Sequence, residues 1–366
     1  MVMVMEQKEY KSLIENLNNK LGFPLEDVIE VNDIPEEEFI CDSIEWYINN
    51  KPIIYNKYDS EFYKFIDYLW NNTSSVIEEN IILAMNNLKK DNVEIYKQFV
   101  DYFQKFDLWG SLDPKNGDYT TIKVRAKTLK HHSFDFIWLY NKVEDYLSKR
   151  TLTAILKNWA FIELDELKNV KSIFDDYFEP DIFKFNYNDV LVDCGAYNGD
   201  SIINYINVYG NYYKKIYAYE ISLETCYECK NNLDSHEVKN VFIMQKGVGK
   251  THCTLSLNSN DESSSANKLS SEGNNLVEVV TIDEDIDDTI TFIKMDIEGA
   301  EYDALLGATN TISNNHPKLA ISIYHGYKDI YRIPHIINKM YENYKFYIRH
   351  NGGNLIPTEF TLLCKI

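Results

Sequence analysis

The sequence lacks several features that would each assign the protein to a particular class. It contains no run of about 18 apolar residues, so we expect no membrane span. The N-terminal residues MVMVMEQKEYK lack the basic start and long apolar core of a signal peptide, so we expect a cytoplasmic protein. Basic residues are in the minority, with 37 Lys and Arg against 57 Asp and Glu. The resulting net charge of −20 argues against a nucleic-acid binder.

Cysteine is also scarce, and the six cysteines are scattered along the chain. Only Cys226 and Cys229 form a C-x-x-C pair. They lie on a predicted helix, without the second pair that a zinc site usually has. We interpret them as helix residues next to a core.

Tryptophan is missing from the second half of the chain, because all five tryptophans lie in the first 160 residues. This change of composition, without a flexible linker, predicts two packed domains, residues 1–180 and 181–366. Apolar residues recur at helical spacing in the first domain, for example at Leu13, Leu17 and Leu21, so we expect it to be mainly helical. Its predicted role is either to cover a substrate cleft or to form a homo-oligomer.

The second half alternates predicted strands and helices, which is typical of an α/β domain with a parallel sheet. We expect strands near residues 189–193, 215–220, 240–245, 291–296 and 317–324. The last two segments, YKFYIRH and TEFTLLCKI, predict a hairpin whose final strand is antiparallel to the sheet. The Ser- and Asn-rich segment from Asn258 to Asn275 is predicted to be a long loop.

The segment VLVDCGAYNGD, from Val190 to Asp200, predicts a buried strand followed by a glycine-rich turn and the start of a helix. Glycine lets a ligand approach the backbone closely, and the free N–H groups at a helix start attract polar ligand groups. The next strand ends in Glu220, where a carboxylate can accept both hydroxyls of a ribose. The predicted cofactor-binding residues are Asp193, Gly195, Ala196, Tyr197, Gly199, Asp200, Ser201, Glu220 and Ile221.

The glycine spacing favours one class of cofactor. A dinucleotide fold uses G-x-G-x-x-G, whereas this chain has Gly195-x-x-x-Gly199 with Asp193 and Asp200 beside it. These acids would repel a pyrophosphate but could hold an ammonium group. S-adenosylmethionine carries an amino acid end and a ribose and has no phosphate, so the spacing favours it over NAD.

The C-terminal half, from about residue 185 to residue 366, resembles the FkbM family of S-adenosylmethionine-dependent methyltransferases. The matching segments are VDCGAYNGD, IYAYE ending at Glu220, VVTID ending at Asp283, IKMDIEGAE, and SIYH ending at His325. The resemblance implies a class I methyltransferase (Rossmann-like) domain that ends in an antiparallel strand. It also implies O-methyl transfer to a hydroxyl of a sugar or natural product.

The strand FIKM and the residues after it carry the candidate catalytic groups. Side chains alternate along a strand, so Lys294 and Asp296 share one face. The next strand delivers Tyr324 and His325 to the same edge of the sheet, because binding sites in open α/β sheets lie at the carboxyl ends of the strands. We expect His325, Asp296 and Lys294 to be the catalytic residues.

The sequence leaves three interpretations of this cluster open. His325 or a carboxylate acts as general base on an acceptor hydroxyl. Alternatively, Asp296, Glu298, Glu301 and His325 bind Mg²⁺ or Mn²⁺, which would acidify the hydroxyl. The third interpretation is a salt-bridge network around Lys294 that only stabilises the fold.

The predicted function is therefore methylation of a sugar hydroxyl, on a nucleotide-linked or surface-glycan precursor for capsule or lipopolysaccharide. Aromatic residues of the first domain would stack on the sugar. The alternatives are methylation of a non-sugar natural product, an NAD-dependent sugar-modifying enzyme, and a binding protein with an inactive methyltransferase domain.

Overall fold

The computed structural model describes residues 7–31, 39–258, 268–270, 276–353 and 355–366, which fall into two compact units. The helical unit comprises Met1–Lys171, Gly326–Arg332 and Ile348–Thr358. The sheet unit comprises Ser172–His325, Ile333–Tyr347 and Glu359–Ile366. Two segments from the C-terminal half of the sequence thus belong to the unit that the N-terminal half forms. That each unit is a domain with its own role stays a prediction.

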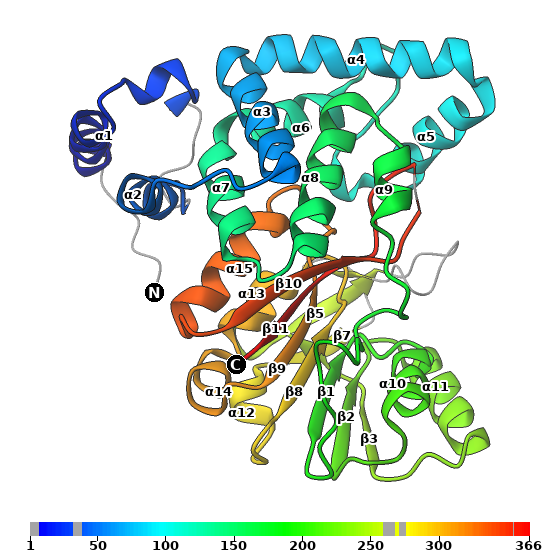
Figure 1. The fold of residues 1–366 in the computed structure, drawn as a ribbon. Coiled ribbons are helices and arrows are strands. Elements are labelled where there is room, and N and C mark those ends of the chain that lie inside the picture. Colours follow the sequence, from blue (N-terminus) through cyan, green and yellow to red (C-terminus); the bar gives the residue numbers. More distant parts are fainter. Residues whose placement is uncertain (1–6, 32–38, 259–267, 271–275, 354) are drawn as a thin grey trace. The chain divides into compact units, whose positions relative to one another are not determined.

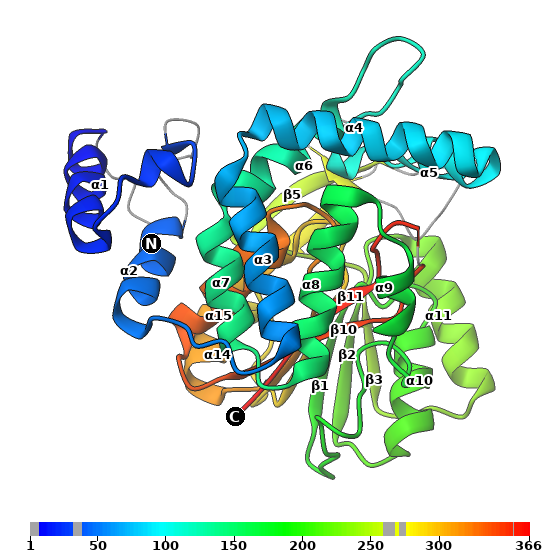
Figure 2. The same cartoon turned by 45° about the horizontal axis from the view of Figure 1, so that its top comes forward.

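The helical unit consists largely of α-helices (Figure 2). Helices α3, α7 and α8 pack against one another, α2 packs against α7, and α4 packs against α5, α6 and α8. No helix among the described residues is long and apolar enough to cross a membrane. The elements are α1 (Gln7–Leu21), η1 (Leu25–Asp27), α2 (Ile40–Asn50), α3 (Lys57–Asn71), α4 (Ser74–Asp91), α5 (Val93–Lys105), η3 (Asp107–Trp109), α6 (Thr120–His131), α7 (Ser133–Lys142), α8 (Tyr146–Phe161) and α9 (Asp165–Asn169).

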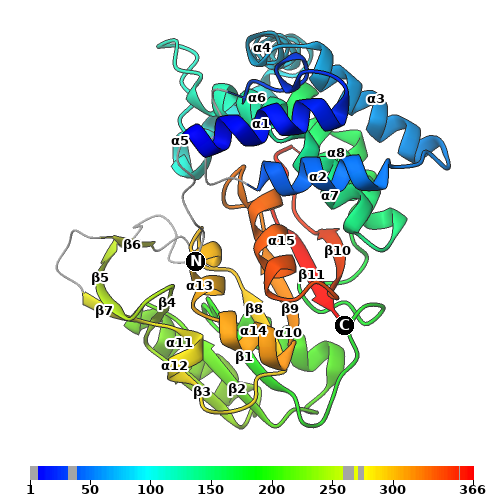
Figure 3. The same ribbon diagram turned by 90° about the vertical axis from the view of Figure 1, so that its left-hand side faces the viewer.

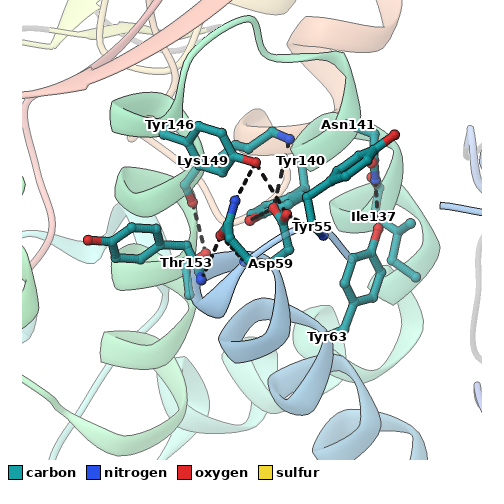
Figure 4. Close-up of polar contacts among 11 residues, drawn as sticks. Tyr55, Asp59, Tyr63, Ile137, Tyr140, Asn141, Tyr146, Lys149 and Thr153 are labelled. Carbon is teal, nitrogen blue, oxygen red and sulfur yellow. Dashed lines mark hydrogen bonds and ion pairs between the residues drawn. The ribbon is translucent and has the colours of Figure 1, made fainter. Parts of the chain in front are cut away.

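A buried carboxylate joins three helices of this unit. Asp59 of α3 accepts hydrogen bonds from the hydroxyls of Tyr140 and Tyr146, at 2.8 and 3.2 Å, and from the N–H of Tyr55 at 3.0 Å (Figure 4). The ammonium group of Lys149 lies 4.0 Å from the same carboxylate. A buried charge is tolerated only when it is paired and hydrogen-bonded. These contacts therefore fix α3 against α7 and α8.

Two tyrosines hold the segment Gly326–Arg332 in the helical unit. The hydroxyl of Tyr327 accepts a hydrogen bond from Nε of the buried Arg125 at 3.1 Å. The ring of Tyr331 stacks on His132 with centroids 4.0 Å apart, and its hydroxyl lies 3.1 Å from Nε2 of His132. The segment is thus packed by its own buried side chains.

The sheet unit is built on a seven-stranded sheet with the order β10-β11-β9-β8-β1-β2-β3 (Figure 1). Strands β3, β2, β1, β8 and β9 run parallel, and β11 runs antiparallel to β9. The expected parallel sheet with an antiparallel final strand is confirmed. The strands are β1 (Val190–Cys194), β2 (Lys215–Tyr219), β3 (Val241–Met244), β8 (Phe292–Met295), β9 (Lys318–Ser322), β10 (Lys345–His350) and β11 (Phe360–Lys365).

Helices cover the faces of this sheet. Ile202 and Tyr205 of α10 pack with Leu233 of α11 against a face that contains Leu191 and Phe292. Apolar side chains on the core face are the main stabilising term for such a sheet. The helices of this unit are α10 (Asp200–Tyr209), α11 (Leu223–Ser235), α12 (Ile282–Asp285), α13 (Glu301–Leu306), α14 (Thr309–Asn315) and α15 (Asp329–Met340), whose first turn belongs to the helical unit.

A second, four-stranded sheet has the order β4-β7-β5-β6 (Figure 3). Its strands are β4 (Gly247–Val248), β5 (Cys253–Asn258), β6 (Lys268–Ser270) and β7 (Leu276–Val280). The sequence predicted one long loop from Asn258 to Asn275, but this segment contains β6, which pairs with β5. Residues 259–267 and 271–275 of that predicted loop lie outside the described residues.

We expect Asp145→Ala to destabilise the helical unit by about 1–3 kcal/mol. Asp145 caps α8 by accepting from the N–H of Ser148 at 2.8 Å, and its two oxygens accept from Arg349 at 3.3 and 2.7 Å. Burial alone would raise the pKa of Asp145, but the hydrogen bonds from Arg349 and Ser148 lower it.

Because the pKa of Asp145 is lower in the folded state, its stabilising effect is present above the unfolded pKa of about 3.9 and is lost as pH falls through the folded pKa. Urea unfolding of the wild type and the variant at neutral pH and at about pH 2 checks this, because the difference between them should shrink in acid. An equal difference at both pH values would contradict the assignment.

Candidate active site at the carboxyl ends of the strands

The candidate site lies where the parallel strands end. The chain leaves β1 into the glycine turn, β2 into Glu220, β8 into Asp296, and β9 towards His325. Parallel strands deliver their carboxyl ends to one edge of the sheet, which is where open α/β sheets bind ligands. Residues from four separate segments therefore meet at this edge.

The glycine turn is held close to its neighbours. The N–H groups of Gly195 and Ala196 both donate to the carbonyl of Tyr219, at 3.0 and 2.9 Å. Gly195 has φ +77°, and a Cβ added there would lie 1.8 Å from the carbonyl oxygen of Asp296. Gly199 has φ +87° and caps α10. Only glycine adopts both conformations without strain, so the turn needs these residues.

Glu220 is buried beside the turn. One of its oxygens accepts from the N–H of Tyr197 at 3.1 Å, and the other accepts from the N–H of Ser222 at 2.8 Å. Burial raises the pKa of Glu220, although these backbone hydrogen bonds partly oppose it. Each carboxylate oxygen has two acceptor positions, so Glu220 keeps acceptor capacity for a ligand. Ile221 follows it and is half-buried.

Asp193, Lys294 and Ser201 form a buried group behind the turn. Asp193 and Lys294 are directly paired across β1 and β8, so their side chains lie on the same face of the sheet. Nζ of Lys294 lies 3.0 Å from Oδ1 of Asp193 and donates to the carbonyl of Gly195 at 2.7 Å. The hydroxyl of Ser201 donates to Asp193 at 2.5 Å. Asp200 is exposed at the start of α10.

Lys294 is charged in this environment. Burial alone would lower its pKa, but the charges of Asp193 and Asp296 raise it. Its ammonium group also lies 5.1 Å from the ring centroid of Tyr177. These contacts make Lys294 a cation that binds the glycine turn to β8. That Lys294 is a catalytic residue stays a prediction.

His325 lies among three carboxylates. Its Nδ1 is 2.9 Å from Glu301, and its Nε2 is 3.3 Å from Asp296 and 3.8 Å from Glu298. Glu301 is itself oriented by the N–H of Ile297, which donates to it at 2.8 Å. Burial alone would lower the pKa of His325, but Glu301, and then Asp296 and Glu298, raise it to about 10. His325 is therefore an imidazolium at neutral pH.

The same geometry bears on the predicted metal ion. Ligand atoms of Asp296, Glu301 and His325 lie within 4.8 Å of one another, which is close enough to share an ion. A ligating histidine must be neutral, however, and metal binding would have to displace the proton that the three carboxylates stabilise. The residues of the cluster fit mutual ion pairing better than they fit a divalent cation.

Two residues of the site, Tyr177 and Glu359, were not predicted from the sequence. The hydroxyl of Tyr177 donates to Asp296 at 2.5 Å, although Tyr177 precedes β1 and lies 119 residues before Asp296 in the sequence. Glu359 immediately precedes β11, and its side chain is hydrogen-bonded to Tyr324. No local pattern marks Tyr177. The predicted antiparallel final strand does bring its first residues to the edge where the parallel strands end, and it could have indicated Glu359.

The comparisons with known proteins agree with this sheet. Residues 193–348 match the model of the methyltransferase FkbM domain. This part of the chain is an FkbM methyltransferase domain. The crystal structure of methyltransferase FkbM from Methylobacillus flagellatus KT is 27% identical, with a TM-score of 0.57, over 70% of this chain. The match spans 63% of the length of that protein. The sheet of the FkbM domain is thus that of a class I methyltransferase, as the sequence predicted.

Other solved structures are less similar. An rRNA methylase from Streptococcus thermophilus is 16% identical with a TM-score of 0.33, over 50% of this chain and 88% of that chain. A Streptococcus mutans protein in complex with SAH is 15% identical with a TM-score of 0.33, over 50% of this chain and 91% of that chain. These two likenesses are too weak to support a conclusion. No curated protein sequence matches the chain.

We expect Gly195→Ala to destabilise the FkbM domain by several kcal/mol, because the added methyl group would collide with the backbone of Asp296. Gly117 is the matched control, since it has the same φ of +77° and no atom within 4 Å of an added Cβ. Gly117→Ala should cost only the left-handed backbone penalty of about 1–2 kcal/mol. Thermal unfolding of both variants is the measurement. Equal losses would show that the close approach to Asp296 does not matter.

Proposed function

We propose that this protein transfers a methyl group from S-adenosylmethionine to a hydroxyl oxygen of a sugar. The observation that supports this most is the pair formed by the glycine turn and Glu220 in an FkbM domain. Our proposed acceptor is a nucleotide-linked or surface-glycan precursor, met in the cytoplasm. The helical unit would cover the substrate or form a homo-oligomer.

The residues present fit this cofactor. Gly195 leaves no room for a side chain beside Asp296, so the glycine turn lies directly against the chain that follows β8. Glu220 would accept the ribose hydroxyls, Ile221 would pack on the adenine, and the turn from Ala196 to Ser201 would hold the amino acid end. S-adenosylmethionine supplies the methyl group as an electrophilic sulfonium. A pyrophosphate would meet the exposed carboxylate of Asp200 at the helix start, which argues against NAD.

The charged groups next to Asp296 would position the acceptor. The hydroxyls of Tyr177 and Tyr324 both donate to Asp296, at 2.5 and 3.4 Å, and so orient this carboxylate. His325, as an imidazolium, fixes Asp296 and Glu301 and so keeps the shape of the site. Positioning of this kind supplies much of the rate in a reaction between two bound molecules.

Three other functions stay open to test. Methylation of a non-sugar natural product would use the same residues. An NAD-dependent sugar enzyme would need the third glycine that the turn lacks. An inactive binding domain would not need a buried carboxylate at Glu220 beside the glycine turn.

We expect Glu220→Ala to weaken binding of S-adenosylhomocysteine by about 1–3 kcal/mol, because it leaves the ribose hydroxyls without their acceptor. Titration calorimetry at neutral pH measures this. Glu237→Ala, an exposed residue on the same unit, is the control and should bind like the wild type. Binding of NAD instead of S-adenosylhomocysteine by the wild type would refute the methyltransferase proposal.

The acceptor is tested by a screen that measures release of S-adenosylhomocysteine. UDP-, GDP- and dTDP-sugars are compared with small phenols and with peptides, and we expect turnover with a nucleotide sugar. Methylation of phenols or amines alone would refute the sugar proposal and leave methyl transfer intact.

The same reactions, run in excess EDTA, test whether the predicted metal ion is required. Because His325 is protonated, we expect unchanged rates.

A further inference from the structure

We propose that Glu359 is the general base that removes the proton of the acceptor hydroxyl. The proposal rests on the methyl transfer proposed above and assigns its base. The candidates that the sequence suggested are His325, Asp296 and Lys294, and Glu359 was not among them.

The sheet topology brings Glu359 to the site. β11 runs antiparallel to β9, with Thr361 paired to Ser322 and the N–H of Ile323 donating to the carbonyl of Phe360 at 3.1 Å. An antiparallel strand begins at the edge where its parallel neighbours end. Glu359, one residue before β11, therefore lies opposite Tyr324, and the two side chains are hydrogen-bonded. Tyr324 in turn reaches Asp296.

The other ionisable groups of the site are protonated or held in ion pairs, so they are poorer candidates for the general base. His325 already carries its proton, which Glu301, Asp296 and Glu298 stabilise, so it cannot accept another. Asp296 pairs with His325, which helps to lower its pKa even though burial alone would raise it. A carboxylate with a low pKa is a weak base. Lys294 is a cation bound to Asp193 and to the carbonyl of Gly195.

The backbone at Glu359 is strained, with φ +51° in a residue that has a side chain. Tyr177 and Glu298 have φ of +70° and +56°. A non-glycine residue in this region costs roughly 1–3 kcal/mol and persists only where the surroundings impose it, commonly at functional sites. Three such residues lie around Asp296. The fold therefore maintains an unfavourable conformation that directs Glu359 into the site.

The surroundings of Glu359 suit a base that works near neutral pH. Burial raises the pKa of its carboxyl, and the charges of Asp296 and Asp176 raise it further, to about 7, against the opposing effects of the Tyr324 hydrogen bond and of His325. A base is most effective when its pKa lies near the working pH. Tyr177 also interacts with the charge of Glu359, so the groups that face this carboxyl are Asp176, Tyr177, Asp296, Tyr324 and His325.

In the proposed step, the acceptor oxygen forms a bond to the methyl carbon while the bond from that carbon to sulfur breaks. The electron pair of the broken bond goes to sulfur, which leaves as the neutral thioether. The hydroxyl proton passes to the carboxylate of Glu359, which later releases it to water. The products are the methyl ether, S-adenosylhomocysteine and, after proton release, the ionised carboxylate again.

The first test uses the whole protein and needs no acceptor. In protein labelled with ¹³C at the glutamate carboxyl, the Glu359 signal is identified by its loss in Glu359→Gln. With S-adenosylhomocysteine present, we expect this signal to titrate with a midpoint within about one unit of pH 7. A midpoint near the ordinary glutamate value of about 4.3 would overturn the proposal.

The second test uses the nucleotide sugar that turns over in the screen above. We expect Glu359→Gln to lower kcat by at least about 100-fold and to abolish the rising limb of kcat/KM near pH 7. Its affinity for S-adenosylhomocysteine and its melting temperature should match those of the wild type. A loss below about threefold, or a rising limb that persists in the variant, would overturn the assignment.

Glu237→Gln is the matched control, because Glu237 is also a glutamate with positive φ, +55°, but is exposed between α11 and β3. It should change neither kcat nor the pH profile. Calorimetry separates the two proposals: a wild type that does not bind S-adenosylhomocysteine contradicts the proposed function. If the wild type does not bind S-adenosylhomocysteine but its Glu359 signal titrates with a midpoint near pH 7, the surroundings inferred for the Glu359 carboxyl are still supported.

Discussion

The buried ion pair between Lys294 and Asp193 is the contact on which the candidate site depends. It connects the two central strands, β1 and β8, and through the carbonyl of Gly195 it also holds the turn between β1 and α10. Removing one partner of a buried pair leaves an uncompensated charge and typically costs several kcal/mol. The pair thus joins the glycine turn to β8, while the carbonyl of Tyr219 holds the turn to β2.

The ion pairs around His325 lie next to the pair of Lys294 and Asp193. In this second group negative charges outnumber positive ones. Around His325 there are three carboxylates for one imidazolium, and Lys294 supplies the nearest further positive charge. Asp296 accepts hydrogen bonds from Tyr177 and Tyr324 and forms an ion pair with His325. Burial raises the pKa of the Glu359 carboxyl, and the charges of Asp296 and Asp176 raise it further.

The sequence predicted the parts of this architecture that follow from local patterns. Runs of apolar residues before Gly195 and Asp296 predicted buried strands. The pattern of a hairpin in the last residues predicted the final antiparallel strand. The sequence did not predict the four-stranded sheet, whose short strands include β6 of three residues, nor the two segments that join the helical unit. It left open whether His325 is a base, a metal ligand or part of a salt-bridge network, because the proton of a histidine depends on charges that only the folded chain assembles. Tyr177 reaches the site from outside any regular element, so no periodicity marks it.

The path of the chain has a mechanical consequence. His325 is the last residue of the sheet unit before the chain first re-enters the helical unit at Gly326, and Glu359 is the first residue after the chain leaves that unit for the last time. Both residues are therefore joined by one peptide bond to a segment of the other unit. A fragment cut after residue 180 would retain all the strands of the large sheet yet leave Tyr327 and Tyr331 without Arg125 and His132. The chain thus passes between the FkbM domain and the helical unit several times. Neither can be exchanged between proteins by joining two chains at a single point.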